Sequence, residues 1–178
     1  MNFTLRNFRR EDFEILWRID QQCFPPRVAY SRLELATYIR RKGSFTLVAE
    51  VSAANHDEPV AETSGGETVR PKIAGFIVAE SGRRGIGHII SIDVLGAARR
   101  SGIGSKLLAA AEDRLRSIPC HSIVLETAVD NASALAFYKR HGYHVMKTIP
   151  RYYSNGVDAF VMEKDLARPA EADAADHT

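Results

Sequence analysis

A short run in the middle of the chain combines glycines and arginines in the way that phosphate-binding turns do. Residues 99–104 read RRSGIG and lie between a predicted strand and a predicted helix that contains Leu107. Glycines let the backbone turn tightly, and the start of a helix offers unpaired amides and a partial positive charge. These features together bind phosphates, and Arg99, Arg100 and Lys106 add full charges. Taken alone, the run also fits an ordinary glycine turn that caps a helix.

The spacing of these glycines excludes the two commonest nucleotide-binding loops. A dinucleotide-binding turn would need a third glycine at the position that Leu107 occupies. A Walker-type loop would need four residues between its first glycine and its Gly-Lys pair, whereas only Ile103 separates Gly102 from Gly104. We therefore expect neither of these two nucleotide sites.

Two residues further along the chain have side chains that can move protons. Glu126 follows the apolar run 123–125, and ligands of α/β sheets bind near the carboxyl ends of strands. Tyr138 lies about one helical turn after Ala134, and a phenol, with a reference pKa of about 10, stays protonated and can donate. Spacing alone favours structural alternatives, which are an ion pair for Glu126 and a core position for Tyr138.

The elements that must position these residues alternate between strand and helix periodicity. Ser31 with Glu34 forms a capping box, and Asn131 is the N-cap of a later helix. The pattern predicts an α/β protein with one mixed sheet of about seven strands and four helices. We predict strands over 4–8, 45–51, 73–81, 88–94, 122–128, 143–149 and 157–164, and helices over 10–23, 31–41, 107–118 and 132–141.

Length and composition are those of a soluble globular protein. The chain has 178 residues, of which 45% are hydrophobic and 26% charged. We expect one domain over residues 1–166, with a long mobile loop over 52–72 and a disordered tail over 167–178. The net charge of +2 does not favour nucleic acid or an anionic membrane as a partner.

Cysteine and histidine usage points to a cytoplasmic protein without a metal site. No secretory segment is apparent, so Cys23 and Cys120 are expected to be reduced thiols. Neither has the partner pattern of a nucleophile, which favours direct attack over a covalent enzyme intermediate. A helix stop separates His141 from His144, so we expect no zinc, and His141 at a helix end is a partner of the helix dipole.

On these residues the chain resembles the GNAT superfamily of N-acetyltransferases. Its pyrophosphate motif, Arg/Gln-x-x-Gly-x-Gly/Ala, is matched by Arg99, Gly102 and Gly104, and the resemblance covers about residues 4–166. A narrower resemblance is to bacterial ribosomal-protein-alanine N-acetyltransferases and other N-terminal acetyltransferases. The segments that carry it are Cys23-Phe24-Pro25 with Ser31, Leu125-Glu126 with 130–134, 136–139 with Gly142-Tyr143, and Arg151-Tyr152-Tyr153 with Gly156 and Asp158-Ala159.

The resemblance implies a GNAT fold whose sheet is splayed between the fourth and fifth strands, with acetyl-CoA as the co-substrate. It makes Glu126 the proton acceptor and Tyr138 the proton donor, and it places the oxyanion near a backbone amide of the fourth strand. It lines the acceptor entrance with Tyr152 and Tyr153, for which packing on a strand pair is the alternative. The implied cofactor-binding residues are Ile92, Asp93, Val94, Arg99, Arg100, Ser101, Gly102, Ile103, Gly104, Ser105 and Asn131.

Two segments depart from the family pattern, and the side chain of Asp93 is open to two interpretations. Leu95-Gly96-Ala97-Ala98 stands where the family often has a proline and an aromatic residue, and the 52–72 segment is longer than usual. Asp93 could face the acceptor amine, but its side depends on the direction of its strand. Asp158 could hold the last hairpin or receive the substrate, and we favour the structural role.

We therefore expect acetyl transfer from acetyl-CoA to an amine by a monomer or weak dimer. The first expectation for the acceptor is the N-terminal α-amine of a protein, possibly ribosomal, because such an amine has a reference pKa of about 7.7–8.0 and is deprotonated easily. A small-molecule amine or a lysine side chain is the alternative within enzymes. A regulatory module that binds CoA without turnover would keep Arg99, Gly102 and Gly104 but would need neither Glu126 nor Tyr138. A further alternative is a subunit that docks another protein through 52–72.

Overall fold

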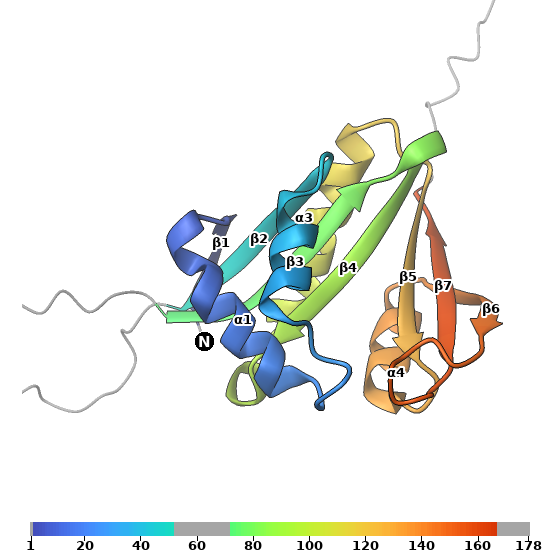
Figure 1. Ribbon diagram of the computed structural model, residues 1–178. Coiled ribbons are helices and arrows are strands. Elements are labelled where there is room, and N and C mark those ends of the chain that lie inside the picture. Colours follow the sequence, from blue (N-terminus) through green and yellow to red (C-terminus); the bar gives the residue numbers. More distant parts are fainter. Residues whose placement is uncertain (1, 52–71, 167–178) are drawn as a thin grey trace, which may run out of the picture.

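One open sheet runs through the described part of the chain (Figure 1). The computed structural model describes residues 2–51 and 72–166, which form seven strands in the order β1-β2-β3-β4-β5-β7-β6. The predicted loop beyond Val51 and the predicted tail lie outside these residues, except that Lys72 already belongs to a strand. The strands are β1 (Phe3–Asn7), β2 (Ser44–Val51), β3 (Lys72–Ser81), β4 (Ile86–Val94), β5 (Ser122–Ala128), β6 (His144–Ile149) and β7 (Ala159–Asp165).

The sheet is mixed, and it opens in the middle. All neighbouring strands pair antiparallel except β4 and β5, which are parallel. That parallel contact is short, joining Ile86–His88 to Ser122–Val124. In Figure 1 the two strands meet at the top of the view and separate downwards. The predicted mixed α/β fold, splayed between the fourth and fifth strands, is confirmed.

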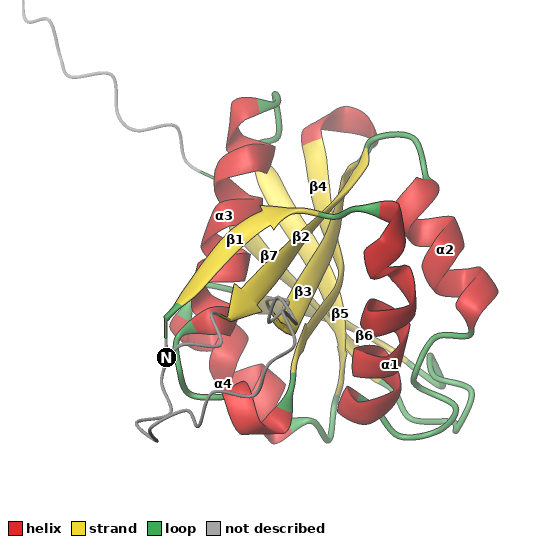
Figure 2. Cartoon of the chain, turned by 90° about the vertical axis from the view of Figure 1, so that its left-hand side faces the viewer, coloured by secondary structure: helices red, strands yellow, loops and turns green. Residues whose placement is uncertain are grey.

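The described chain has four α-helices, and they cover both faces of the sheet (Figure 2). The helices α1 (Phe13–Cys23) and α2 (Arg32–Arg40) lie on one face, over a core that includes Leu16, Leu35 and Phe76. The helices α3 (Ile103–Ser117) and α4 (Ala132–Arg140) lie on the other face, over the larger core around Leu107 and Leu125. No helix in the described part is long and apolar enough to cross a membrane.

Local signals set the helix starts. The Ser31 hydroxyl accepts from the Glu34 amide, and the Glu34 side chain accepts from the Ser31 amide, so the predicted capping box begins α2. The Asn131 side chain accepts from the Ala134 amide and begins α4. α1 follows a single 3-10 turn at Arg10–Asp12, which the sequence pattern had merged with it.

Several predicted boundaries differ from the observed ones by two to four residues, and two of them concern the site. α3 begins at Ile103 rather than Leu107, because Gly102 takes a left-handed conformation and the helix starts directly after it. The last strand begins at Ala159 rather than Val157, so β6 and β7 are joined by the loop 150–158. The predicted turn at 154–156 lies within this loop, where the Gly156 amide bonds the Tyr153 carbonyl.

Candidate functional site

The opening between β4 and β5 exposes one backbone edge of β4. Beyond His88 the strand stays paired with β3, but its pairing with β5 has ended. An unpaired edge presents N–H and C=O groups that an extended ligand can bond. Ile92, Asp93 and Val94 lie on this stretch. Their position fits the predicted backbone contacts with pantetheine, which stay a prediction.

The first turn of α3 lies near the end of this edge and has free amides. Its N-cap, Gly102, has φ +89° and forms no side-chain hydrogen bond to the helix, whereas α2 and α4 are capped by Ser31 and Asn131. The Lys106 amide donates to the carbonyl of the N-cap, Gly102, which is the first backbone bond of the helix. The amides of residues 103–105 precede it, so they are available to an anion. The helix α3 is 15 residues long, and no side chain caps its start. This uncapped start is the feature that fits a diphosphate.

The turn before α3 is held by its own side chains. Arg99 Nε donates to the Val94 carbonyl at 3.1 Å, and Ser101 Oγ donates to the Ala98 carbonyl at 2.6 Å. A 3-10 turn at Gly96–Ala98 replaces the proline and aromatic residue of the family pattern. Arg99 is therefore partly an anchor of the turn, and Arg100, in a left-handed conformation at φ 61°, is exposed.

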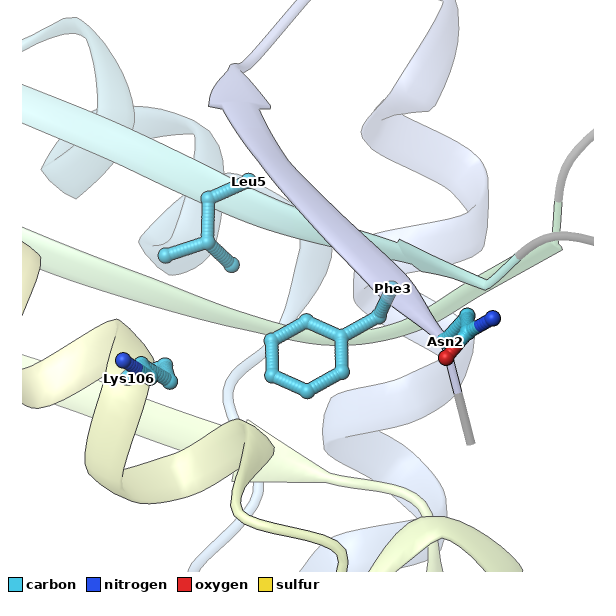
Figure 3. A pocket seen from close by; sticks show the side chains of 4 residues that line it. All are labelled: Asn2, Phe3, Leu5 and Lys106. Atoms are coloured by element: carbon cyan, nitrogen blue, oxygen red, sulfur yellow. The ribbon is translucent and has the colours of Figure 1, made fainter.

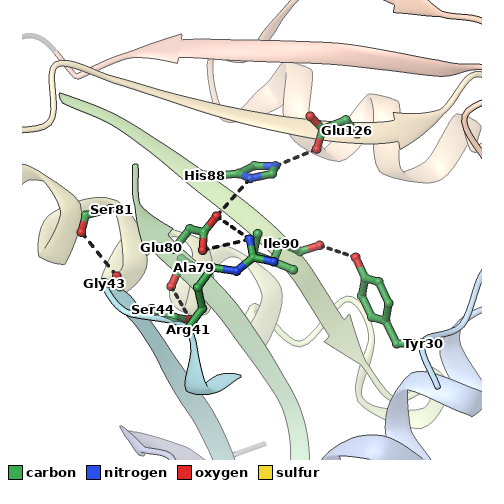
Figure 4. A network of polar contacts seen from close by, with 10 residues as sticks. All are labelled: Tyr30, Arg41, Gly43, Ser44, Ala79, Glu80, Ser81, His88, Ile90 and Glu126. Atoms are coloured by element: carbon green, nitrogen blue, oxygen red, sulfur yellow. Dashed lines mark hydrogen bonds and ion pairs between the residues drawn. The ribbon is translucent and has the colours of Figure 1, made fainter. Parts of the chain in front are cut away.

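Glu126 faces the opening from β5 and is paired with a residue that sequence reasoning missed. Its Oε2 lies 2.7 Å from Nε2 of His88 on β4, across the end of the parallel contact (Figure 4). The Glu126 side chain is 20% exposed, so it lies at the rim of the opening rather than in the core. The structure thus contains the polar pair that was the structural alternative, and the second carboxylate oxygen is left for other partners. A histidine on one strand and a glutamate 38 residues later carry no sequence signal of pairing.

A second carboxylate lies behind His88. Nδ1 of His88 is 3.8 Å from Glu80 Oε1, and that carboxylate is bonded by the Arg41 guanidinium at 3.1 Å (Figure 4). His88 therefore lies between the carboxylates of β3 and β5. This arrangement restricts the orientation of the imidazole, which in turn orients the Glu126 carboxylate.

Tyr138 reaches the site from α4. Its side chain is 7% exposed and packs edge-on against Phe137 and Tyr143. Its hydroxyl forms no side-chain hydrogen bond with the described residues, yet it is not among the fully enclosed polar atoms that lack a partner, so it stays open to solvent or a ligand. Burial, with the nearby carboxylate of Asp93, raises the pKa of Tyr138 above its usual range, so the phenol keeps its proton.

Asp93 is a buried carboxylic acid on the α1 face of β4. The register leaves Ile90 as an extra residue in β4, between the pairs Ser91 with Val78 and Ile89 with Ala79. After this bulge Ile92 faces the α3 core, so Ser91 and Asp93 face α1. Asp93 is 1% exposed, accepts from Ser91 Oγ at 2.8 Å, and leaves its Oδ1 without a partner. Burial raises the pKa of Asp93 to about 8.

Asp20 of α1 is a second buried acid in this region. Its Oδ2 accepts from the Tyr30 amide at 2.8 Å, so it holds the loop between α1 and α2. Its Oδ1 has no partner in the described chain, and burial raises the pKa of Asp20 to about 6. The charge of Asp20 also contributes to the raised pKa of Asp93, after the larger effect of burial.

Two tyrosines predicted to line the acceptor entrance lie in the loop between β6 and β7. Tyr152 and Tyr153 lie in the loop 150–158, with ring centroids 5.0 Å apart, rather than on a strand pair. Burial, followed by the nearby hydroxyl of Tyr152 and the charge of Glu126, raises the pKa of Tyr153 to about 12. The Ser154 hydroxyl donates to the Arg27 carbonyl, which joins this loop to the one after α1. The two loops thus form one rim beside Glu126.

The remaining predicted residues have local structural roles. Asn131 is the N-cap of α4 and also accepts from Ser133 Oγ at 3.0 Å, so a contact with CoA stays a prediction. Asp158 Oδ1 accepts from the Arg151 amide at 2.7 Å, which supports the structural role that we favoured. The His141 Nδ1 lies 2.8 Å from the Phe137 carbonyl at the end of α4, which matches its predicted place at the helix terminus.

A hollow of about 480 Å³ lies away from these residues (Figure 3). Phe3 and Leu5 of β1 form one side of it, and Lys106 of α3 forms the other. β1 is the far edge strand of the sheet, so the hollow does not include the Glu126 or Tyr138 side chain. Within residues 2–51 and 72–166 there is no group of three or more His, Cys, Asp or Glu side chains that could hold a metal ion.

The family comparison is consistent with this site. Residues 13–143 match the family model described as the acetyltransferase (GNAT) family. This range includes Glu126, Tyr138 and the turn before α3, and it ends before the tyrosine-bearing loop.

Curated relatives are N-acetyltransferases. An N-acetyltransferase of Methanocaldococcus jannaschii is 43% identical over 94 residues, which are 52% of this chain and 60% of that protein. N-alpha-acetyltransferase 30 of Schizosaccharomyces pombe is 42% identical over 74 residues, which are 42% of this chain and 49% of that protein. The match thus spans about half the length of these relatives. An N-alpha-acetyltransferase of Saccharolobus solfataricus is 28% identical over 168 residues, covering 93% of this chain and 94% of that protein.

Solved structures share the fold over nearly the whole chain. Ard1 from Thermoplasma volcanium has a TM-score of 0.78 and 25% identity, covering 94% of this chain and 100% of that one. A chain of the NatC complex bound to Gag peptide and CoA has a TM-score of 0.71 and 27% identity, with the same coverage. The ribosomal-protein-S18-alanine N-acetyltransferase from Escherichia coli, at 21% identity and a TM-score of 0.72, covers 96% of this chain and 98% of that one and shows the fold alone.

Proposed function

Because this chain belongs to the acetyltransferase (GNAT) family, we propose that it transfers the acetyl group of acetyl-CoA to the N-terminal α-amine of a protein. The observation that carries the proposal is the geometry of the opening. An uncapped helix start lies at one side of it, and a tyrosine with an unpartnered hydroxyl and a rim glutamate lie at the other.

Acetyl-CoA supplies a thioester whose carbonyl carbon can be attacked by an amine. The free amides of the first α3 turn would bind its diphosphate, and the open edge of β4 would bind its pantetheine arm. A backbone amide near Val94 would stabilise the charge that develops on the carbonyl oxygen. The residues that this chain provides therefore fit the coenzyme at three successive points.

The acid and base roles follow from the surroundings of two side chains. Glu126 takes the proton of the attacking amine, directly or through a water, as the C–N bond forms. Tyr138 gives its proton to the sulfur as the C–S bond breaks, which its raised pKa permits because the phenol is protonated at neutral pH. No side chain becomes acetylated, since direct attack needs no nucleophile from the chain.

Several observations favour a protein N-terminus as the acceptor. Two of the curated relatives carry the name N-alpha-acetyltransferase. The rim is formed by two loops that carry Tyr30, Tyr152 and Tyr153, which suits an extended peptide entering between them. An α-amine also demands less of its base than a lysine side chain, whose reference pKa is near 10.4. A ribosomal protein is our first candidate for the acceptor.

A peptide panel tests the acceptor. Peptides with free N-termini, among them the first residues of ribosomal proteins, are compared with the same peptides blocked at the α-amine but keeping a lysine. Acetylation of the free set alone supports the proposal. Acetylation of lysine in the blocked set, or of small amines only, points to the alternative acceptor. Tight CoA binding with no acetylation of any acceptor points to a regulatory module.

A further inference from the structure

The first turn of α3 is joined to the end of α4 by a hydrogen bond between two side chains. His141 Nε2 lies 3.0 Å from Ser105 Oγ, while His141 Nδ1 lies 2.8 Å from the Phe137 carbonyl. The His141 ring also lies against the Phe137 ring, with centroids 4.4 Å apart. Phe137 in turn approaches Gly104, where an added Cβ would lie 3.4 Å from its ring. The imidazole is therefore held in one orientation beside the free amides of α3.

Hydrogen-bond accounting assigns the protons of this contact. The Phe137 carbonyl can only accept, so His141 Nδ1 must carry a proton. In the neutral imidazole Nε2 is then an acceptor, and the Ser105 hydroxyl donates to it. In this state the Ser105 proton points away from any anion bound at the helix start.

We propose that His141 is a positioning residue for the coenzyme, and that binding of the diphosphate is coupled to uptake of one proton at His141. A solvent proton adds to Nε2, which then donates to Ser105 Oγ, and the hydroxyl proton of Ser105 turns to a phosphate oxygen. The protonated imidazole also places a positive charge beside Ser105, the residue that would contact the diphosphate. The inference rests on the proposed function, since it needs the coenzyme at α3.

The groups around the His141 ring provide no negative charge to balance a protonated imidazole, so that charge would come from the ligand. The described groups that hydrogen-bond or stack with the ring are Ser105 of α3 and the carbonyl and ring of Phe137 of α4. The adjoining charged residues, Lys106 on α3 and Lys139 and Arg140 on α4, are all cations. His141 forms no ion pair within the described ranges. An anion at the start of α3 would therefore be the counter-charge of the imidazolium.

Calorimetry with dephospho-CoA tests the coupling. This probe keeps the diphosphate and lacks the 3′-phosphate monoester, whose own titration near pH 6 would otherwise add to the proton count. Titrations in two buffers of different ionisation enthalpy give the number of protons taken up. We expect net uptake by the wild-type chain, and an affinity that weakens by about threefold to tenfold from pH 6 to pH 8.

Two variants separate the coupling from structural effects. In His141→Asn the amide nitrogen can still donate to the Phe137 carbonyl but does not reach Ser105, so we expect affinity to fall and its pH dependence to vanish. Ser105→Ala, which removes the link without touching α4, is expected to do the same and keeps the test valid should the first variant unfold. His144→Asn, at an exposed position on β6, is the matched control and should take up protons as the wild type does.

The outcomes distinguish a failure of the proposed function from a failure of the role proposed for His141. If the wild type binds neither CoA nor dephospho-CoA, the proposed function fails. If it binds both, and either folded variant takes up protons and follows pH as the wild type does, only the role of His141 is overturned.

Discussion

His88 Nε2 lies 2.7 Å from Glu126 Oε2, and the two residues come from the strands between which the sheet opens. The contact joins the last paired residue of β4 to a residue of β5 that lies two positions beyond Val124, the last paired residue of that strand, so it lies at the narrow end of the opening. It also orients one oxygen of the proposed base and leaves the other free.

Replacing the proposed base should affect chemistry and leave coenzyme binding intact. For Glu126→Gln we expect kcat to fall by about 10²–10⁴-fold, the range that a positioned proton acceptor contributes. The dissociation constant of CoA, measured by calorimetry, should change less than about twofold, because Glu126 is not near the α3 amides. An unchanged kcat with a good peptide acceptor would remove Glu126 from this role.

His88 should act through the orientation of Glu126. His88→Gln keeps a nitrogen donor near the position of Nε2, whereas His88→Leu removes it. We expect kcat to fall by about tenfold or more in the leucine variant and to recover largely in the glutamine variant, with KM little changed in both. Equal losses in the two variants would mean that the imidazole does more than hold the carboxylate.

Tyr138→Phe should separate activity from stability. The hydroxyl has no described partner, so its removal should change the free energy of unfolding by less than about 0.5 kcal/mol. The loss of the proton donor should lower kcat by about 10²-fold or more. Urea unfolding and steady-state kinetics of the same preparation check both halves. A large loss of stability with normal turnover would identify Tyr138 as a core residue only.

Gly102→Ala should weaken both the helix start and coenzyme binding. Gly102 has φ +89°, where an L-residue costs about 1–2 kcal/mol. We expect a loss of stability of that size and at least tenfold weaker CoA binding, because the free amides follow this residue. Gly96→Ala is the control, since its φ is ordinary and an added Cβ there has no neighbour within 4 Å. If both variants bind CoA equally well, the α3 start is not the diphosphate site.

Asp93 should make the fold less stable as pH rises. Burial raises its folded pKa to about 8, while the unfolded pKa is near 3.9. Between these values the folded state binds more protons than the unfolded state, so the free energy of unfolding falls with rising pH. Asp93→Asn should remove this slope and raise the melting temperature at pH 8 by about 2–4 °C for each kcal/mol gained.

The Asp93 prediction is checked by thermal melts at several pH values. The stabilisation in the asparagine variant should be larger at pH 8 than at pH 5, since at pH 5 the wild-type acid is already neutral. A difference that grows towards low pH would mean that Asp93 is ionised and paired in the folded protein.

The sequence by itself determined the local elements of this protein, namely its helix caps, its glycine turn and its strands. The caps at Ser31 and Asn131, the glycine turn before α3 and the strand periodicities depend on residues a few positions apart, and the structure has these elements within one to four residues of the predicted bounds. The phosphate-binding interpretation of residues 99–104 and the inward face of Tyr138 came from the same kind of signal. The family follows from those residues because they are close together in the chain.

Only the tertiary structure decided how distant residues meet. His88 with Glu126, and Ser105 with His141, are pairs separated by 38 and 36 residues, and strand pairing and helix packing bring them together. The bulge at Ile90 decided the side of Asp93, because one extra residue shifts every later side chain to the other face of the strand. Such contacts depend on register and on the opening of the sheet, which no local pattern of residues encodes.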